Sequence, residues 1–235
     1  MDVHAVNMLL VTTPLDAARD TPVTPATTPL KGHPYHHGDL RHALIDAAVE
    51  LAHEGGPGAI VLREAARRVG VSPNAAYRHF DSLPDLVVQV ALVALNRMAL
   101  VMQSELDRCV STDDPALDAQ TRMEAVGRGY VRFALDEPGL FATAFTSPEK
   151  TNMHERADAD NLLTPETLLT DRLDELVATG VLNPEEYDAA AKTGWGIAHG
   201  LSMLLLGPLS GVPLDERPAL IDACLRIVTR GLRST

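Results

Sequence analysis

The sequence is poor in aromatic side chains and in cysteine. Its 235 residues include one tryptophan, four tyrosines, four phenylalanines and two cysteines. The isolated cysteines Cys109 and Cys224 argue against a disulfide-stapled secreted domain and predict two thiols in a reducing cytoplasm. We also see no basic segment followed by an apolar stretch at the N-terminus, and no apolar run that reaches the length of a membrane span. We therefore expect a cytoplasmic protein with no membrane partner.

Signatures of catalysis are also scarce. The sequence has no nucleophile elbow, phosphate-binding loop or dinucleotide fingerprint, and no carboxylate pair stands out as an acid and base. His33, His36 and His37 lie close together, but no cysteine or carboxylate stands at ligand spacing, which favours a polar arm over a metal site. We predict no catalytic residue, no metal and no cofactor. An all-helical enzyme stays open as an alternative.

What the sequence has in abundance is alanine and leucine at helical spacing, which predicts an all-α fold. No period-two strand pattern and no internal repeat interrupt it. Residues 1–32 are rich in proline and threonine and predict a disordered tail. A polar stretch over 146–161 predicts a mobile loop. The spacing and capping residues predict helices over about 39–54, 62–69, 73–80, 83–108, 117–135, 183–206 and 214–232, with shorter ones after Pro138 and Pro165.

The segment 62–80 predicts two short helices joined by a tight turn. Gly70 stands where a helix that ends in the left-handed conformation favours a residue without Cβ. Ser72 is placed to cap the next helix, and Pro73 occupies its first position, where a missing N–H costs nothing. This is the pattern of a helix-turn-helix with residues 73–80 as the recognition helix. The first of the two helices has apolar residues on one face: Leu62, Ala65, Ala66 and Val69.

Charge supports contact with nucleic acid at this segment. The whole chain has a formal charge of −12, but residues 62–80 hold four arginines against one glutamate. Screening cuts off distant charge within about 8–10 Å, so the local balance decides phosphate contact. A plain helical hairpin with a solvated basic face is the competing interpretation of the segment, and core packing is a separate alternative for Tyr77. The candidate DNA-binding residues are Arg41, Arg63, Ser72, Pro73, Asn74, Ala75, Tyr77, Arg78 and His79.

These segments resemble the tetracycline repressor (TetR) family. The resemblance is carried by residues 35–41 (YHHGDLR) and by 62–80 with its end YRHF. Residues 137–141 (EPGLF) and 195–200 (WGIAHG) resemble the Trp…His-Gly (WHG) C-terminal subfamily. Val61 and Leu83 stand where family members often carry a phosphate-binding Ser or Thr and Lys. The resemblance implies a DNA-binding domain over 33–82 and a ligand-binding and dimerisation domain over 83–235, in a homodimer that represses transcription until a small molecule binds.

The resemblance also implies an effector cavity in the second domain. Ligand sites are mostly apolar with a few convergent polar groups, and the apolar residues of this domain permit such a site. Ordinary core packing explains any single one of them equally well, and His199 can equally be a buried histidine bonded to the backbone. The candidate ligand-binding residues are Met102, Met123, Tyr130, Phe141, Phe145, Trp195 and His199.

A single recognition helix reads too few bases for specificity, which favours a dimer on a two-fold operator. Small residues at helical spacing in 183–206 let a partner helix approach, and with 214–232 they predict a four-helix interface. An intramolecular hairpin is the alternative. The candidate interface residues are Ala190, Gly194, Ala198, Leu201, Leu220, Cys224 and Ile227. We thus expect a repressor that an effector releases from a pseudo-palindromic operator. The second hypothesis for the function is a constitutive DNA-binding regulator that has no effector.

Overall fold

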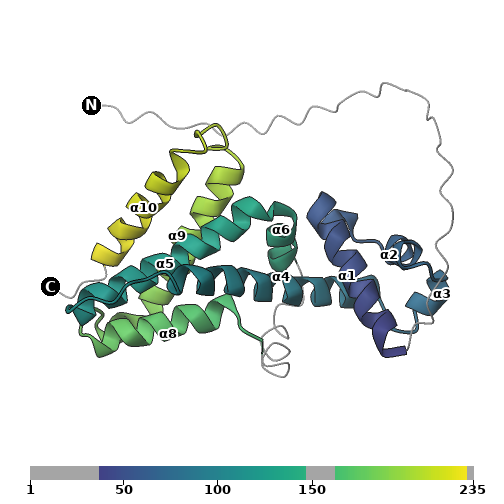
Figure 1. Cartoon of the computed structure of the whole chain (residues 1–235), viewed down its shortest axis with the longest axis horizontal. Helices are drawn as coiled ribbons and strands as arrows, with labels where there is room; N and C mark the ends of the chain where they lie inside the picture. Colours follow the sequence, from purple (N-terminus) through teal and green to yellow (C-terminus); the bar gives the residue numbers. More distant parts are fainter. Residues whose placement is uncertain (1–36, 147–161, 232–235) are drawn as a thin grey trace. The chain divides into compact units, whose positions relative to one another are not determined.

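The computed structural model describes residues 37–146 and 162–231, and every regular element in these ranges is a helix (Figure 1). This confirms the predicted all-α class. The predicted tail over 1–32, the side chains of His33, His36 and His37, and the predicted loop after Thr146 lie outside what is described. In chain order, with η for a 3-10 helix, the elements are α1 (His37–Gly55), η1 (Pro57–Ala59), α2 (Leu62–Val69), α3 (Pro73–Ala76), α4 (Leu83–Leu106), α5 (Pro115–Asp136), α6 (Pro138–Thr146), α8 (Pro165–Ala178), η3 (Pro184–Glu186), α9 (Tyr187–Leu206) and α10 (Arg217–Gly231).

The first three helices form a small bundle with the start of α4. Helix α1 packs on α2 and α4, and α2 packs on α3. The expected start of α1 at Asp39 is two residues too late, because the helix already begins at His37. The bundle has one apolar core, which excludes water from the crossing of the short helices. Its buried residues include Leu44, Ala48, Leu62, Ala66, Ala76, Phe80 and Leu86.

Helix α3 is shorter than the predicted recognition helix over 73–80. Regular α-helix ends at Ala76, and the next residues wind more tightly: the Arg78 amide donates to the Ala75 carbonyl and the His79 amide to the Ala76 carbonyl. Such i→i+3 bonds are common at the ends of helices. The winding still brings Phe80, which is 3% exposed, into the core of the bundle.

Helix α4 begins as predicted at the Ser82 cap, whose hydroxyl accepts from the Asp85 amide at 3.3 Å. By length and composition it is apolar enough to cross a membrane, so the expectation that no apolar run reaches that length is wrong. Half of its apolar window is buried within the protein, against α1, α5, α6 and α8. Burial among these neighbours accounts for a helix that is apolar on most sides.

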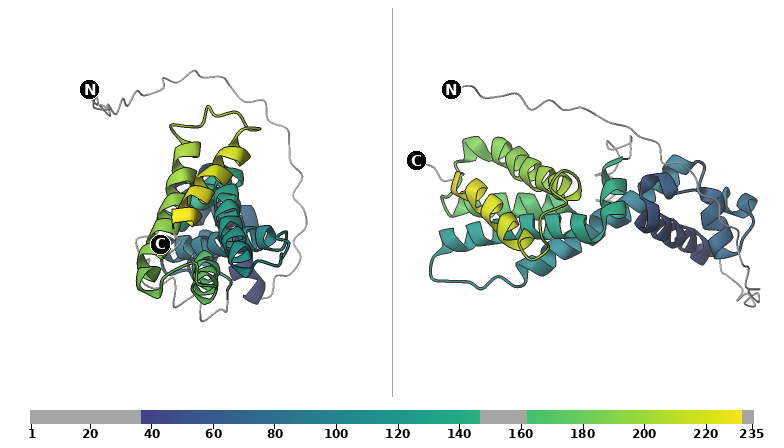
Figure 2. Two further views of the ribbon diagram at one scale, coloured as in Figure 1. Left: turned by 90° about the vertical axis from the view of Figure 1, so that its left-hand side faces the viewer. Right: turned by 90° about the horizontal axis from the view of Figure 1, so that it is seen from above.

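The remaining helices pack along α4 and α5, and α9 and α10 lie side by side (Figure 2). Thr164 caps α8, and Gly180 follows it with a φ of +72°, as expected. The expected helix from residue 183 begins with one 3-10 turn before α9. Helix α10 begins at Arg217 and not near Leu214, since the Glu216 and Arg217 amides both bond to the Pro213 carbonyl in a preceding turn.

Helix α6 touches the end of α1 at very short range. A Cβ at Gly139 would lie 2.1 Å from the Ala52 carbonyl oxygen and 3.0 Å from that of His53. Only glycine therefore permits this approach of the two backbones. Beside it, the His53 Nδ1 lies 2.5 Å from a carboxylate oxygen of Glu137. The junction therefore joins α6 directly to the end of α1.

Candidate functional site

The turn between α2 and α3 has the geometry predicted from its sequence. Gly70 has a φ of +79°, the left-handed region that favours glycine. Its amide bonds to the Arg67 carbonyl, and the Val71 amide bonds to that of Ala66, which together form a Schellman motif. Ser72 then caps α3 through a bond from the Ala75 amide at 3.3 Å. Both helix ends are satisfied locally, so the angle between the helices is fixed by this short stretch.

The face beyond the turn is exposed. Tyr77 is 49% exposed, so it is not part of the core. Ala75 and His79 are half-buried at the edges of the face. Arg41 reaches this region from α1, with its guanidinium carbon 5.3 Å from the centre of the Phe80 ring, a cation–π contact that orients it. The structure thus places all the candidate DNA-binding residues in one bundle, and the exposed ones are Arg63, Ser72, Pro73, Asn74, Tyr77 and Arg78.

Not every arginine of the segment is available to a phosphate. Glu64 accepts two hydrogen bonds from Arg67, at 2.7 and 2.8 Å, and Arg68 makes a two-point pair with Glu54 at 2.6 and 2.8 Å. The hydrogen bond from Arg67 lowers the pKa of Glu64 to about 2. Arg63 and Arg78 have no acidic partner within 4 Å among the described residues.

These ion pairs revise the simple count of charge over 62–80. The i,i+3 and i,i+4 spacing of Glu64 with Arg67 and Arg68 made the ion pairs within α2 predictable from sequence. The pair with Glu54, on another helix, had no such signal. Val61 and Leu83 are both exposed, and Val61 caps α2 without any side-chain bond, as its lack of a hydroxyl requires.

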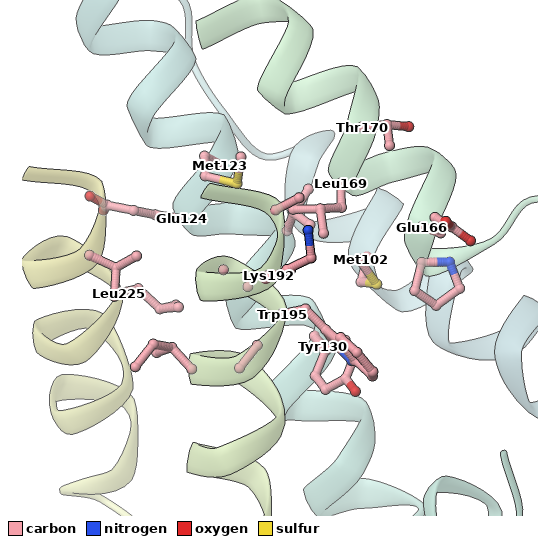
Figure 3. A pocket seen from close by; sticks show the side chains of 18 of the residues that line it. Met102, Met123, Glu124, Tyr130, Glu166, Leu169, Thr170, Lys192, Trp195 and Leu225 are labelled. Atoms are coloured by element: carbon pink, nitrogen blue, oxygen red, sulfur yellow. The ribbon is translucent and has the colours of Figure 1, made fainter. Parts of the chain in front are cut away.

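The helices from α4 to α10 enclose a cavity of about 400 Å³ (Figure 3). This volume lies in the range of small-molecule sites, roughly 300–1,000 Å³. Its walls come from α4, α5, α6, α8, α9 and α10. Five of the seven candidate ligand-binding residues line it: Met102, Met123, Tyr130, Phe145 and Trp195.

The other two candidates, Phe141 and His199, line a second hollow of about 380 Å³ between α6 and α9. Tyr130 and His199 join the two hollows, because the tyrosine hydroxyl lies 2.9 Å from the histidine Nδ1. Burial raises the pKa of Tyr130 well above its usual range, so the phenol keeps its proton. The Phe145 ring packs at 4.8 Å from the His199 ring and lines both hollows.

The polar groups of the larger cavity were missed at the level of sequence. They come from four helices, and only spatial proximity relates them. Glu124 lies on α5, one helical turn before Gly127, and faces α10. Its position in the sequence does not indicate that it lines a cavity. The polar lining residues are Glu124, Thr164, Glu166, Thr170, Asp188, Lys192 and Thr229.

The predicted stripe of small residues on α9 needs a correction. Ala190, Ala198 and Leu201 are buried inside their own subunit, where small side chains let neighbouring helices of the same chain approach. Gly194 lines the cavity. On α10, Leu220 and Cys224 pack partly against the same core, and Ile227 is 70% exposed. The helices α9 and α10 pack on one another within the chain, and an interface between two copies stays a prediction.

Part of α9 is exposed, on a face that borders the buried stripe and includes the cavity-lining Ile197. It carries large apolar residues at helical spacing, including Ile197 and Leu204 seven apart, with Met203 beside them. A Cβ added at Gly196 or Gly200 would meet no atom within 4 Å. This face therefore offers apolar surface and room for close approach of another helix.

Within the described ranges, no group of three or more His, Cys, Asp or Glu side chains could hold a metal ion. Cys109 and Cys224 are free, half-buried thiols, as predicted. Burial raises the pKa of the Cys109 thiol, which makes it less reactive than an exposed one.

Comparison with known proteins gives two matches to models of one family. Residues 44–90 match "bacterial regulatory proteins, tetR family". Residues 123–228 match "tetracyclin repressor-like, C-terminal domain". The HTH-type transcriptional repressor KstR of Rhodococcus jostii is 28% identical in a match that covers 48% of this chain and 63% of KstR. The chain thus spans less than two thirds of that relative.

Solved structures share the fold over most of the chain. A Rhodococcus sp. RHA1 protein of unknown function has a TM-score of 0.68 and 27% identity, covering 86% of this chain and all of the other. FadR of Bacillus subtilis, solved with stearoyl-CoA, has a TM-score of 0.59 and 16% identity, covering 82% and 99%. With both family models matched in the expected order, and an all-helical structure that presents a helix-turn-helix before a helical domain, this chain belongs to the TetR family of regulators.

Proposed function

We propose that the protein is a ligand-responsive transcriptional repressor, which a small molecule releases from a pseudo-palindromic DNA operator. The observation that carries the proposal is the exposed end of the helix-turn-helix, where Asn74, Tyr77 and Arg78 face solvent. Arginine and asparagine are the side chains that read guanine and adenine edges in the major groove. Arg63 and Arg41 then bind phosphates of the DNA backbone, and Ala75 contacts a thymine methyl group. KstR, the relative named above, is itself described as a transcriptional repressor.

A dimer follows from the need to read two half-sites. Two-fold related recognition helices in successive major grooves double the number of bases that are read. In place of the buried stripe on α9, we propose that the exposed face of α9, with Ile197, Gly200 and Leu204, pairs with its copy. Ile227 of α10 extends the apolar surface. Among the predicted interface residues, Ile227 is the one whose exposure best suits this role.

Effector binding in the cavity is proposed to act through α6. Phe145 lies in the wall of the cavity and belongs to α6, whose Gly139 is in tight contact with α1. A ligand that displaces Phe145 thus pushes on a helix that has no room to move without moving α1. The ligand shifts the equilibrium only by its differential affinity for the two arrangements. Binding of stearoyl-CoA by FadR, a protein with this fold, supports an effector role for the domain.

Three finer points belong to the proposal. We place the boundary between the DNA-binding and the ligand domains at residues 82 and 83. We assign the C-terminal domain to the WHG subfamily on its WGIAHG segment, and we take the protein to work in the cytoplasm without catalysis. A constitutive regulator is the second candidate. It is favoured only if the cavity binds nothing.

The test is operator binding by fluorescence anisotropy, on a duplex selected from random DNA. Arg78→Ala should weaken binding by about tenfold or more, since a bidentate base contact is worth about 1–3 kcal/mol. Arg230→Ala, an exposed arginine near the end of α10, is the matched control and should leave affinity unchanged. Equal affinity of native protein and the Arg78 variant would refute the docking assignment.

A further inference from the structure

Glu124 is the polar group of the larger cavity with the clearest surroundings. It lies on α5 and is half-buried. The Thr229 hydroxyl of α10, in a residue that is 3% exposed, donates to its Oε1 at 2.7 Å. No described lysine or arginine lies within 4 Å of this carboxylate. Glu124 thus brings a negative charge to the cavity wall that a neutral hydroxyl supports and no cation of the described chain neutralises.

The contact between α5 and α10 holds this arrangement in place. A Cβ at Gly127 would lie 2.6 Å from the Leu225 Cδ2, so the helices meet closely one turn from Glu124. The Arg128 Nε donates to a carboxylate oxygen of Asp222 at 2.9 Å on the same pair of helices. These contacts hold α5 and α10 together beside the Thr229–Glu124 pair, and the Thr229 hydroxyl also lies 3.3 Å from the Leu225 and Arg226 carbonyl oxygens.

The charges on the lining have an uneven sign. The lining carries the carboxylates of Glu124 and Asp188 and one ammonium, from Lys192. Lys192 is mostly exposed and lies 3.9 Å from the Asp188 carboxylate, in a solvated i,i+4 pair. The ammonium is thus partly neutralised at the mouth, and the potential inside favours a positive ligand group over a negative one.

Most of the remaining wall is apolar. Figure 3 shows Met102, Tyr130 and Trp195 between Glu124 on one side and Glu166 on the other. A ligand that matches this lining has an apolar body and one charged end, and is therefore an amphiphile. Desolvation of the charged end is offset only where an opposite charge meets it, and Glu124 supplies that charge.

From this juxtaposition we propose that the cavity recognises an amphiphile with a protonated amine, whose ammonium binds Glu124 while its apolar body lies against Met102, Tyr130 and Trp195. This rests on the proposed function, since it names the class of the effector for the same site. A long-chain carboxylate would place its charge against the Glu124 carboxylate, and is the class that the site disfavours.

The test uses three probes with the same tail and different heads: decylamine, decanol and decanoate, each below its aggregation limit. Binding to the full chain is measured by isothermal titration calorimetry at pH 7. Decylamine should bind about tenfold more tightly than decanol, because a hydrogen bond to a charged group is worth clearly more than a neutral one. Decanoate should bind more weakly still.

Glu124→Gln keeps the size of the side chain and an oxygen that accepts from Thr229, so the variant should stay folded. It should bind decylamine and decanol equally. Glu185→Gln removes an exposed carboxylate outside the cavity lining and should keep the preference. Decanoate binding as tightly as decylamine, a preference that survives in Glu124→Gln, or no binding of any probe each overturns the proposal.

Operator affinity is measured on the same preparations without a probe. If the protein does not bind the operator, the proposed regulator is refuted, whatever the order of the probe affinities. If the protein binds the operator but the three probes bind in another order of affinity, only the proposed class of ligand is refuted.

Discussion

Substitution of Gly139 by alanine tests the junction through which the cavity is proposed to act on DNA. In an ordinary helix, alanine is more favourable than glycine by about 1 kcal/mol. Here the new Cβ would lie 2.1 Å from the Ala52 carbonyl oxygen. A carbon–oxygen contact needs roughly 3.3 Å, so α6 and the end of α1 must separate by about 1 Å. Overpacking of this kind costs about 1–3 kcal/mol, which reverses the sign of the substitution.

We expect two measurable results. The melting temperature should fall by roughly 2–12 °C, at about 2–4 °C per kcal/mol for a chain of this size. Operator affinity should fall by about tenfold, which corresponds to a bias of about 1.4 kcal/mol toward the displaced arrangement. Differential scanning calorimetry and fluorescence anisotropy give the two values.

The matched control is Gly58→Ala, in η1, where an added Cβ meets no atom within 4 Å. It should change stability by no more than about 0.5 kcal/mol. If Gly139→Ala melts at the native temperature and binds the operator normally, the tight junction is not present and the route through α6 is refuted.

Three further predictions concern the bundle and the dimer. Ser72→Ala removes the cap of α3 and should cost roughly 0.5–2 kcal/mol in urea unfolding, with no loss if the cap is unimportant. Glu64→Gln frees Arg67 for phosphate and should steepen the salt dependence of operator binding by up to about 0.9 in the log–log slope. Because the folded pKa of Glu64 is lowered from 4.5 to about 2, the native chain should lose stability as pH falls through this window, and the variant should lose less. An unchanged slope and acid profile would argue against the ion pair. Ile227→Arg should shift sedimentation toward the monomer, and an unchanged dimer would place the interface elsewhere.

The helix-turn-helix could be predicted almost completely from sequence, because each signal there acts locally. The left-handed Gly70, the Ser72 cap and the Ser82 cap each determine the backbone within a few residues. The shortening of α3 escaped prediction, since the tight winding after Ala76 is set by the burial of Phe80 against other helices. The presence of α3 could therefore be predicted from sequence, but the residue at which it ends depends on tertiary contacts.

The cavity could be predicted only in part. Tyr130 and Trp195 were identified through the family resemblance, whereas Glu124 and Thr229 are 105 positions apart and meet only in the fold. The stripe of α9 failed for a related reason. Small residues such as Ala198 allow close approach of any helix, and the sequence does not say whether that helix belongs to the same chain.

The most direct test of the central claim is selection of bound duplexes from random DNA, followed by the mass of the complex. The account predicts enrichment of one two-fold symmetric motif, with half-sites about one helical turn or a multiple apart, bound by an even number of chains. Recovery of no motif, or of a single half-site bound by one chain, would contradict it.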